Sequence, residues 1–306
     1  MKSFSLLALS LLSLPAHALR PESTYNGVGR PFWVKADAGE LKLFAAGSGN
    51  PLASATVGFG RVDLAAALKI WDLKPKTVCY LQQFRNGQAV GAALVLQPMT
   101  NPSISRLKAD GKTVEFVPDE DSAHSGFRVW RDQDAEFHTS LGKIRVHMRP
   151  DAAPNTVWNF IKLVEGGFYK DVIFHRVVAK RADGNPFVIQ GGDPTGTGMG
   201  APGYAFPLED SSLVHDFGVI SMARSTDPNT NGCQFFFALS RAGTQHLDHR
   251  YAAFGETISG GDTILKIAAV PTGAEDRPKD PPLITRIRLV DAAPYGKGPK
   301  PVTRPK

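Results

Sequence analysis

The chain has few cysteines and lacks a long apolar run. Cys79 and Cys233 are its only two cysteines in 306 residues, too few for a small scaffold held by disulfides. Each lies in an apolar, strand-like stretch, which predicts two separately buried thiols rather than a disulfide. No stretch reaches the roughly 20 apolar residues of a membrane-spanning helix, so a soluble protein with no membrane span is expected.

The sequence also lacks a concentrated basic segment that could fold into a nucleic-acid-binding face. The formal net charge is +6 at pH 7. Lys2 contributes +1 and residues 291–306 contribute +3, which leaves +2 for the remainder of the chain. Because nucleic-acid binders gather Lys and Arg on a structured face, a nucleic-acid partner is not expected.

Metal, cofactor and nucleophile motifs are missing. Residues 198–203 match G-x-G-x-x-G, but Pro202 lies inside the match and no strand–helix context surrounds it, so a surface loop is predicted. His246 and His249 have no third ligand at a convincing spacing. Cys233 is predicted to be a small core residue rather than a nucleophile. No metal or cofactor is expected.

Residues 1–18 follow the pattern of a secretory signal peptide. One positive charge precedes an apolar run over residues 4–14, and the small-x-small triplet Ala-His-Ala closes the segment. Cleavage near Ala18 is predicted, so we expect an exported protein, periplasmic or secreted, that starts near Leu19. No cysteine follows the cleavage site, which argues against a lipid anchor.

Residues 19–131 predict a separate β-rich domain. Short strand-like runs alternate with Gly-rich joints, and Asn-Gly at residues 86–87 and Asp-Gly at residues 110–111 favour tight hairpin turns. Several short strands at this spacing suggest a small β-sandwich. Residues 64–71 fit a short helix or a strand almost equally well. No group of residues typical of a catalytic or metal site occurs in this part of the sequence, so a spacer or an interaction module is expected.

Residues 135–292 predict a second β-rich domain with two helices. Apolar residues at helical spacing follow Pro154 and end at the Gly-Gly pair of residues 166–167, and a second helix is predicted over residues 262–270. About eight short strands surround them, so the predicted fold class is mainly β: a closed eight-stranded antiparallel barrel capped by two helices. Residues 293–306 are expected to form a disordered, basic, Pro-rich tail.

Two predicted strands, residues 172–178 and residues 187–190, place a charged side chain among apolar ones. Side chains alternate along a strand, so Phe174, Arg176 and Val178 share one face, and Val188 and Gln190 share a face of the next strand. One interpretation is an Arg whose stem packs on the surface while its head stays in water. The other is a functional guanidinium beside a pocket.

The alternation of side chains along the predicted strands brings together a candidate site that contains no nucleophile and no set of metal ligands. Its apolar members are Phe187, Val188, Phe236 and Leu247, with Tyr251 at the edge, and its polar members are Arg176, Gln190 and Gln234, with the backbone around Ala223 and Arg224. Phe235 and Phe237 are predicted to face the core instead. Such a pocket suits a small apolar group held beside hydrogen-bonding partners for a peptide backbone, and proline in an extended peptide is that kind of ligand.

Seven short motifs occur in order between residues 137 and 290. They are Ala-Pro-x-x-Val-x-Asn-Phe (153–160), Gly-Phe-Tyr (167–169), Phe-His-Arg-Val (174–177), Gln-Gly-Gly-Asp-Pro (190–194), Ser-Met-Ala (221–223), Asn-Thr-Asn-Gly-x-Gln-Phe-Phe (229–236) and Leu-Asp (247–248). In this order and at this spacing, half of the chain resembles the cyclophilin family of peptidyl-prolyl cis-trans isomerases.

The resemblance implies an enzyme that accelerates rotation about X-Pro peptide bonds and needs no cofactor. It places the family's catalytic arginine on Arg176. Its substrate contacts fall on Phe187, Val188, Gln190, Ala223, Arg224, Gln234, Phe236, His246, Leu247 and Tyr251. The expected partners are proline-containing peptides and folding exported proteins, and a monomer is expected. The alternatives are a proline-peptide-binding or chaperone-like module with little turnover, and a structural or adhesion protein that uses the first domain.

The sequence departs from the family at the edge of this site. His246 stands where the family often has a Trp that is important for cyclosporin binding. Tyr251 stands where many members have His, and a Tyr there is similar to many bacterial relatives, so a bacterial, exported member of the family is expected. Val188 is smaller than the usual Met, and Arg224 replaces the usual Asn. Residues 179–185 lengthen a loop at the rim. We expect altered substrate preference with little loss of rate.

Overall fold

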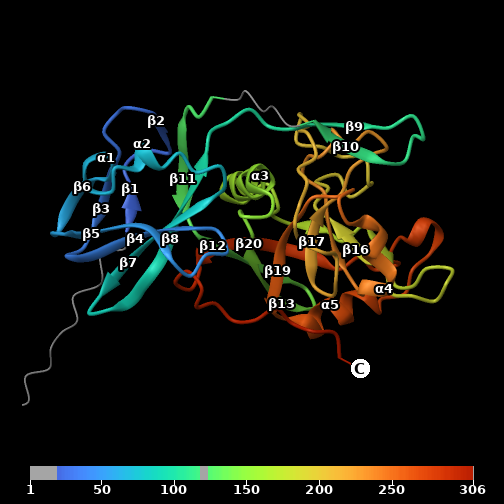
Figure 1. Cartoon of the computed structure of the whole chain (residues 1–306). Helices are drawn as coiled ribbons and strands as arrows, with labels where there is room; N and C mark the ends of the chain where they lie inside the picture. The colour runs from blue at the N-terminus through green and yellow to red at the C-terminus, as the bar shows by residue number, and fades with distance from the viewer. Residues whose placement is uncertain (1–18, 118–122, 306) are drawn as a thin grey trace, which may run out of the picture.

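The computed structural model describes residues 19–117 and 123–305, so the predicted signal peptide of residues 1–18 lies outside the described residues. Figure 1 shows two β-rich halves. They meet where β11 (Gly126–Arg131) runs into β12 (Gln133–Thr139) through the single residue Asp132. In the described part of the chain, no helix is long and apolar enough to cross a membrane.

The first half contains two antiparallel sheets that share one buried core. The larger has the strand order β2-β11-β8-β7-β4-β5 and the smaller β1-β3-β6. Val34 of β3, Leu43 of β4 and Leu94 of β8 are fully buried in the same cluster, so the arrangement is of the sandwich type. The strands are β1 (Arg20–Pro21), β2 (Tyr25–Gly27), β3 (Trp33–Ala36), β4 (Gly39–Ala45), β5 (Pro51–Val57), β6 (Gly60–Asp63), β7 (Cys79–Arg85) and β8 (Gln88–Pro98).

Local turn chemistry explains how these strands connect. Asn86 and Gly87 have φ of 49° and 75°, the left-handed pair that a type I′ hairpin requires, so the predicted β7–β8 turn is confirmed. The ambiguous residues 64–71 fall in two short helices, α1 (Leu64–Ala67) and α2 (Ile70–Leu73). The two are separated because Lys69 between them is left-handed, with φ of 50°.

The second predicted hairpin leaves the sheets of its own half. β9 (Ile104–Leu107) and β10 (Val114–Val117) form an isolated two-stranded sheet. Figure 1 shows it over the yellow and orange part of the second half. Ser105 of β9 is hydrogen-bonded to Asn229 there by two contacts of 2.5 and 3.1 Å, so this hairpin is a contact between the halves.

The second half is a nine-stranded antiparallel sheet in the order β14-β20-β12-β13-β19-β17-β18-β16-β15. The strands not yet named are β13 (Gly142–Met148), β14 (Val172–Ile173), β15 (Arg176–Val178), β16 (Val188–Gly191), β17 (Val219–Met222), β18 (Phe235–Ala238), β19 (Ala253–Ser259) and β20 (Leu283–Asp291).

The predicted closed eight-stranded barrel needs correction. The predicted strand over residues 172–178 is interrupted at Phe174 and His175, so it forms β14, which pairs with β20, and β15, which pairs with β16. Among the described residues no ladder joins β14 to β15. The two ends of the sheet are therefore linked by the chain itself rather than by backbone hydrogen bonds.

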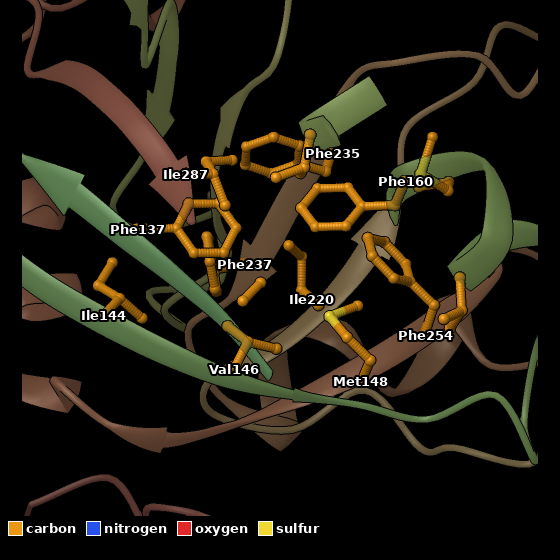
Figure 2. Close-up of a cluster of buried hydrophobic side chains, with 14 of the residues drawn as sticks. Phe137, Ile144, Val146, Met148, Phe160, Ile220, Phe235, Phe237, Phe254 and Ile287 are labelled. Atoms are coloured by element: carbon orange, nitrogen blue, oxygen red, sulfur yellow. The ribbon is translucent and has the colours of Figure 1, made fainter. Parts of the chain in front are cut away.

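The core of the second half is rich in phenylalanine. Figure 2 shows Phe235 and Phe237 of β18 among Phe137 and Phe160, with ring centroids 5.4 to 6.0 Å apart. This confirms their predicted inward direction, because alternate residues of a strand share a face. The two predicted helices are α3 (Pro154–Glu165) and α5 (Gly261–Ala268), and each buries one apolar face. Short helical turns also occur at α4 (Arg241–Thr244), η1 (Gln245–Leu247) and η2 (Ala274–Asp276).

The segment after β20, expected to be disordered, instead packs against both halves. The Tyr295 ring stacks on Tyr80 of the first half with centroids 4.5 Å apart, and its hydroxyl donates to the carbonyl of Ala45. Farther along, the Val302 N–H donates to the Thr257 carbonyl at 2.8 Å. Residues 293–305 therefore fasten the two halves together, which composition alone did not reveal.

Candidate functional site

The register of three neighbouring strands aligns the predicted polar and apolar site residues on one face. Arg176 of β15 is paired with Gln190 of β16, and Gln190 is paired with Phe236 of β18. Directly paired residues point to the same side of a sheet. These three side chains therefore form a row across the strands, on the face opposite the phenylalanine core.

An apolar group lies beside this row. Val188, Phe236 and Leu247 are 3, 5 and 6% exposed and contact one another, with Val178, Phe187, Ala223 and Tyr251 packed around them. We call these seven residues the Phe236 cluster. All the predicted apolar members of the site belong to it, and Val178, which was predicted to share a face with Arg176, joins them. Phe174, predicted on that same face, is instead fully buried in the core of the second half because the strand is interrupted there.

The two predicted glutamines are fixed by each other and by a loop. Gln190 Nε2 donates to Gln234 Oε1 at 3.0 Å. Gln234 Nε2 donates to the carbonyls of Gly198 and Gly200, both at 2.9 Å. The glycine-rich loop of residues 198–203 thus orients a site residue.

Asp193 holds this loop in shape. Its carboxylate accepts the backbone N–H groups of Thr195, Gly198 and Gly200. A Cβ at Gly200 would lie 1.8 Å from the Asp193 carboxylate, so no side chain fits there. Burial opposes ionisation, but the hydrogen bonds outweigh it and lower the pKa of Asp193.

Arg176 meets a carboxylate that the sequence did not single out. Its Nη2 lies 3.4 Å from Asp276 Oδ2, and the two side chains are 42 and 44% exposed. Exposed ion pairs of this kind contribute little to stability, about 0.2–1 kcal/mol. The guanidinium is thus steadied at one end of the row and remains accessible to a ligand.

A buried histidine supports Phe236 and was also missed. The His215 ring is stacked on the Phe236 ring, with centroids 5.8 Å apart and planes 16° apart. Its nitrogens lie 3.0 Å from Asp248 and 2.9 Å from the Ser221 hydroxyl. Burial lowers the pKa of His215, which favours the neutral ring. No local pattern marks this histidine because its role depends on the packing of separate strands.

The lengthened loop of residues 179–185 supplies an unexpected rim residue. Phe187 and His246 are stacked with ring centroids 5.8 Å apart. The Arg181 guanidinium lies 5.4 Å from the Phe187 centroid, and its Nη1 lies 3.0 Å from His246 Nδ1. The lengthened loop therefore places the Arg181 cation at the edge of the site, beside His246, the residue that stands where the family often has Trp.

Arg224 and Tyr251 form the opposite edge. The Arg224 guanidinium lies 4.6 Å from the Tyr251 ring centroid and donates from Nε to the Arg250 carbonyl. The Ala223 N–H is taken by the Gln234 carbonyl at 2.9 Å. Arg224 therefore contributes a whole side chain, whereas the sequence was interpreted in terms of its backbone.

Neither cysteine supplies a reactive thiolate to the site. Both cysteines are free and buried, as predicted, and burial raises the pKa of the Cys233 thiol to about 12, so the reactive thiolate is suppressed. Among the described residues, no group of three or more His, Cys, Asp or Glu side chains could hold a metal ion. What the site offers is an apolar surface, two amides and the accessible Arg176 guanidinium, with Arg181 and Arg224 at its edges.

Comparison with known proteins gives a consistent pattern. Residues 135–289 match the family model described as cyclophilin type peptidyl-prolyl cis-trans isomerase/CLD. Peptidyl-prolyl cis-trans isomerase-like 1 of Emericella nidulans is 42% identical over 164 residues, which is 52% of this chain and 96% of that protein. Peptidyl-prolyl cis-trans isomerase ppi1 of Schizosaccharomyces pombe is 42% identical over 151 residues, which is 48% of this chain and 92% of that protein.

A solved structure is also similar. It is a Cryptosporidium parvum cyclophilin type peptidyl-prolyl cis-trans isomerase in the presence of the dipeptide Ala-Pro. The two chains are 35% identical, with a TM-score of 0.47 over 52% of this chain and 99% of that one.

Proposed function

The chain belongs to the cyclophilin-type peptidyl-prolyl cis-trans isomerase family, and on that premise we propose that it isomerises X-Pro bonds in exported proteins and so assists their folding. The isomerase domain spans residues 135–289. The observation that carries the assignment of the active site is the row Arg176–Gln190–Phe236, which puts a cation, an amide and an apolar ring on one face.

The chemistry of the amide explains why this combination suffices. Resonance makes rotation about the C–N bond slow, with a barrier of about 18–20 kcal/mol. When the amide twists, resonance is lost and the proline nitrogen regains a lone pair. A donor aimed at that nitrogen stabilises the twisted state more than either planar state, and this difference is what accelerates a reaction.

In this proposal Arg176 is that donor, and the Phe236 cluster holds the proline ring. Gln190 and Gln234, held by the loop of residues 198–203, fix the neighbouring peptide groups. His215 is a positioning residue because it contacts the Phe236 ring rather than the substrate. Each 1.36 kcal/mol of preference for the twisted amide gives about tenfold in rate.

The test is NMR exchange spectroscopy on a proline-containing peptide with the full chain. Arg176→Ala should lower kcat/KM by about two to three orders of magnitude, the cost of removing one preorganised donor. Arg286→Ala, which removes an exposed arginine of β20, is the matched control and should retain full activity. Wild-type turnover by folded Arg176→Ala would remove that residue from the mechanism. Peptide binding by the wild type without turnover would favour the binding-module alternative.

The role in export rests on residues 1–18, whose charge, apolar run and small-x-small triplet fit a cleaved signal. Expression with this segment should yield a protein outside the cytoplasm whose mass corresponds to a start at Leu19. A cytoplasmic product that keeps the segment would contradict this part of the proposal. The relatives named above are fungal or from Cryptosporidium, so the bacterial origin expected from Tyr251 stays a prediction.

A further inference from the structure

The β9–β10 hairpin and the second half enclose a hollow of about 410 Å³. Leu107 and Lys112 line it from the hairpin, and Arg224, Arg250 and Tyr251 line it from the second half. Tyr251 is also a member of the Phe236 cluster. The hollow and the proline site therefore share the Tyr251 side chain.

The hairpin wall of this hollow is firmly placed. Ser105 is 1% exposed and is held by its two hydrogen bonds to Asn229. Arg106 is paired with Glu115 across the hairpin, which keeps that carboxylate occupied. Figure 1 shows the hairpin reaching this position from the first half of the chain. The wall is thus a feature of this two-part chain rather than of its isomerase half.

The charge of the hollow has one sign. Its lining includes Lys112, Arg224 and Arg250 and no Asp or Glu, and none of the three cations forms an ion pair within the described residues. The nearby Asp227 instead accepts hydrogen bonds from the backbone and side chain of Asn229. The charge of Asp227 partly offsets that of Arg224, but three like charges gathered in one hollow still repel one another and favour an anionic ligand.

One hydrogen-bond donor here also lacks a partner. Nε of Arg250 is buried and makes no hydrogen bond to the described residues, which is an unfavourable situation for a polar group. Burial also lowers the pKa of Arg224, to which the Arg250 charge contributes. A bound anion would offset the repulsion between the two guanidinium groups.

We propose that this hollow binds an acidic side chain of the substrate polypeptide while its proline lies at the Phe236 cluster. The proposal rests on the assignment of the proline site made above. Leu107 and Tyr251 provide apolar surface on which the methylene groups of a glutamate can pack, and Lys112, Arg224 and Arg250 line the same hollow. The first half thereby contributes to substrate choice by the second.

The experiment compares proline peptides that differ by one side chain. In a neutral host peptide, glutamate or glutamine is placed in turn at each position on either side of the proline, and the full chain is assayed by NMR exchange. We expect glutamate to raise kcat/KM about fivefold over glutamine at one position, mainly through KM, because one partly desolvated ion pair is worth about 1 kcal/mol. The preference should shrink in about 1 M salt, where charges are screened.

Lys112→Gln tests the hairpin, because Lys112 is exposed and its replacement leaves both halves intact. The variant should lower the glutamate-to-glutamine ratio below the wild-type value, while Arg224 and Arg250 keep it above one. Lys108→Gln is the matched control, since Lys108 is exposed on the same hairpin and does not line the hollow, and it should keep the wild-type ratio.

The outcomes separate this inference from the proposal on which it rests. A wild-type ratio of one at every position, with neutral peptides turned over normally, overturns the acidic subsite alone. Equal loss of preference in Lys112→Gln and Lys108→Gln, or no loss in either, also overturns it, because the hollow would then not be the cause. No turnover of any peptide would instead overturn the assignment of the proline site.

Discussion

Asp132, the residue that links the two halves, gives the sharpest test of their junction. It is 4% exposed, and burial, assisted by the nearby carboxylates of Asp134 and Asp151, raises its pKa to about 7. The positive charge of His147 works in the opposite direction. The folded protein thus holds a proton on Asp132 that the unfolded chain, with a carboxyl pKa of about 3.9, has already released.

The sign and size of the effect follow from linkage. Because the folded state binds the extra proton, the stabilising contribution of protonated Asp132 is complete below about pH 4 and is lost as the pH rises through about 7. Between pH 5 and about pH 7 the folded state keeps a proton that the unfolded state has released, and these two pH units correspond to about 2.7 kcal/mol. We expect about 2 kcal/mol because Asp132 lines a hollow of about 580 Å³ that admits water.

Asp132→Asn removes the titrating carboxyl and keeps its shape. We expect the gain in free energy of unfolding over wild type to be larger by about 2 kcal/mol at pH 8 than at pH 5. Urea denaturation at both pH values, followed by the fluorescence of Trp130 and Trp158 at the junction, measures it. Asp280→Asn, at an exposed carboxyl, is the control. A gain that is the same at both pH values would refute the reasoning.

Three further predictions address the site and the fastening of the tail. Phe236→Leu should raise KM for proline peptides about tenfold through loss of ring contact, and unchanged peptide affinity in a titration would show that the proline lies elsewhere. Tyr295→Ala should lower the free energy of unfolding by about 2 kcal/mol because it removes the stacking on Tyr80, and wild-type urea stability would contradict this. Burial opposes ionisation of Asp248, but hydrogen bonds from the Arg241 side chain and the His215 backbone lower its pKa to about 2. Asp248→Asn should therefore be less stable than wild type near neutral pH, and this difference should disappear as the pH falls from about 4 to about 2. An acid unfolding profile equal to that of wild type would argue against the Arg241–Asp248 ion pair.

Local chemistry made much of the fold predictable. The hairpin at Asn86 and Gly87 and the helix after Pro154 follow from turn and capping preferences that act over a few residues. Alternation along β18 separated Phe236 from the inward Phe235 and Phe237. The motif order supplied the remaining members of the site, which spacing alone could not have assembled from five separate segments.

What could not be predicted depends on contacts between distant segments. The break of the strand at Phe174 and His175 arises because the two ends of that segment pair with different strands. His215 gains its role only by lying under Phe236. The hairpin bearing Ser105 looks like any surface hairpin until Asn229 is beside it. Composition suggested disorder after residue 293, yet one tyrosine there finds an aromatic partner more than 200 residues earlier.

That tyrosine sets an order of events during biosynthesis. Residues 19–117 leave the ribosome long before Tyr295, so their aromatic surface at Tyr80 and Phe44 stays uncovered while the intervening chain is made. The first half can gain its sheets early, but it reaches its final packing only when the last residues arrive. Premature termination anywhere in the second half would therefore leave the aromatic side chains of Phe44 and Tyr80 exposed on the first half. A bulky group attached near residue 295 would expose them too, because it would keep Tyr295 from packing on them.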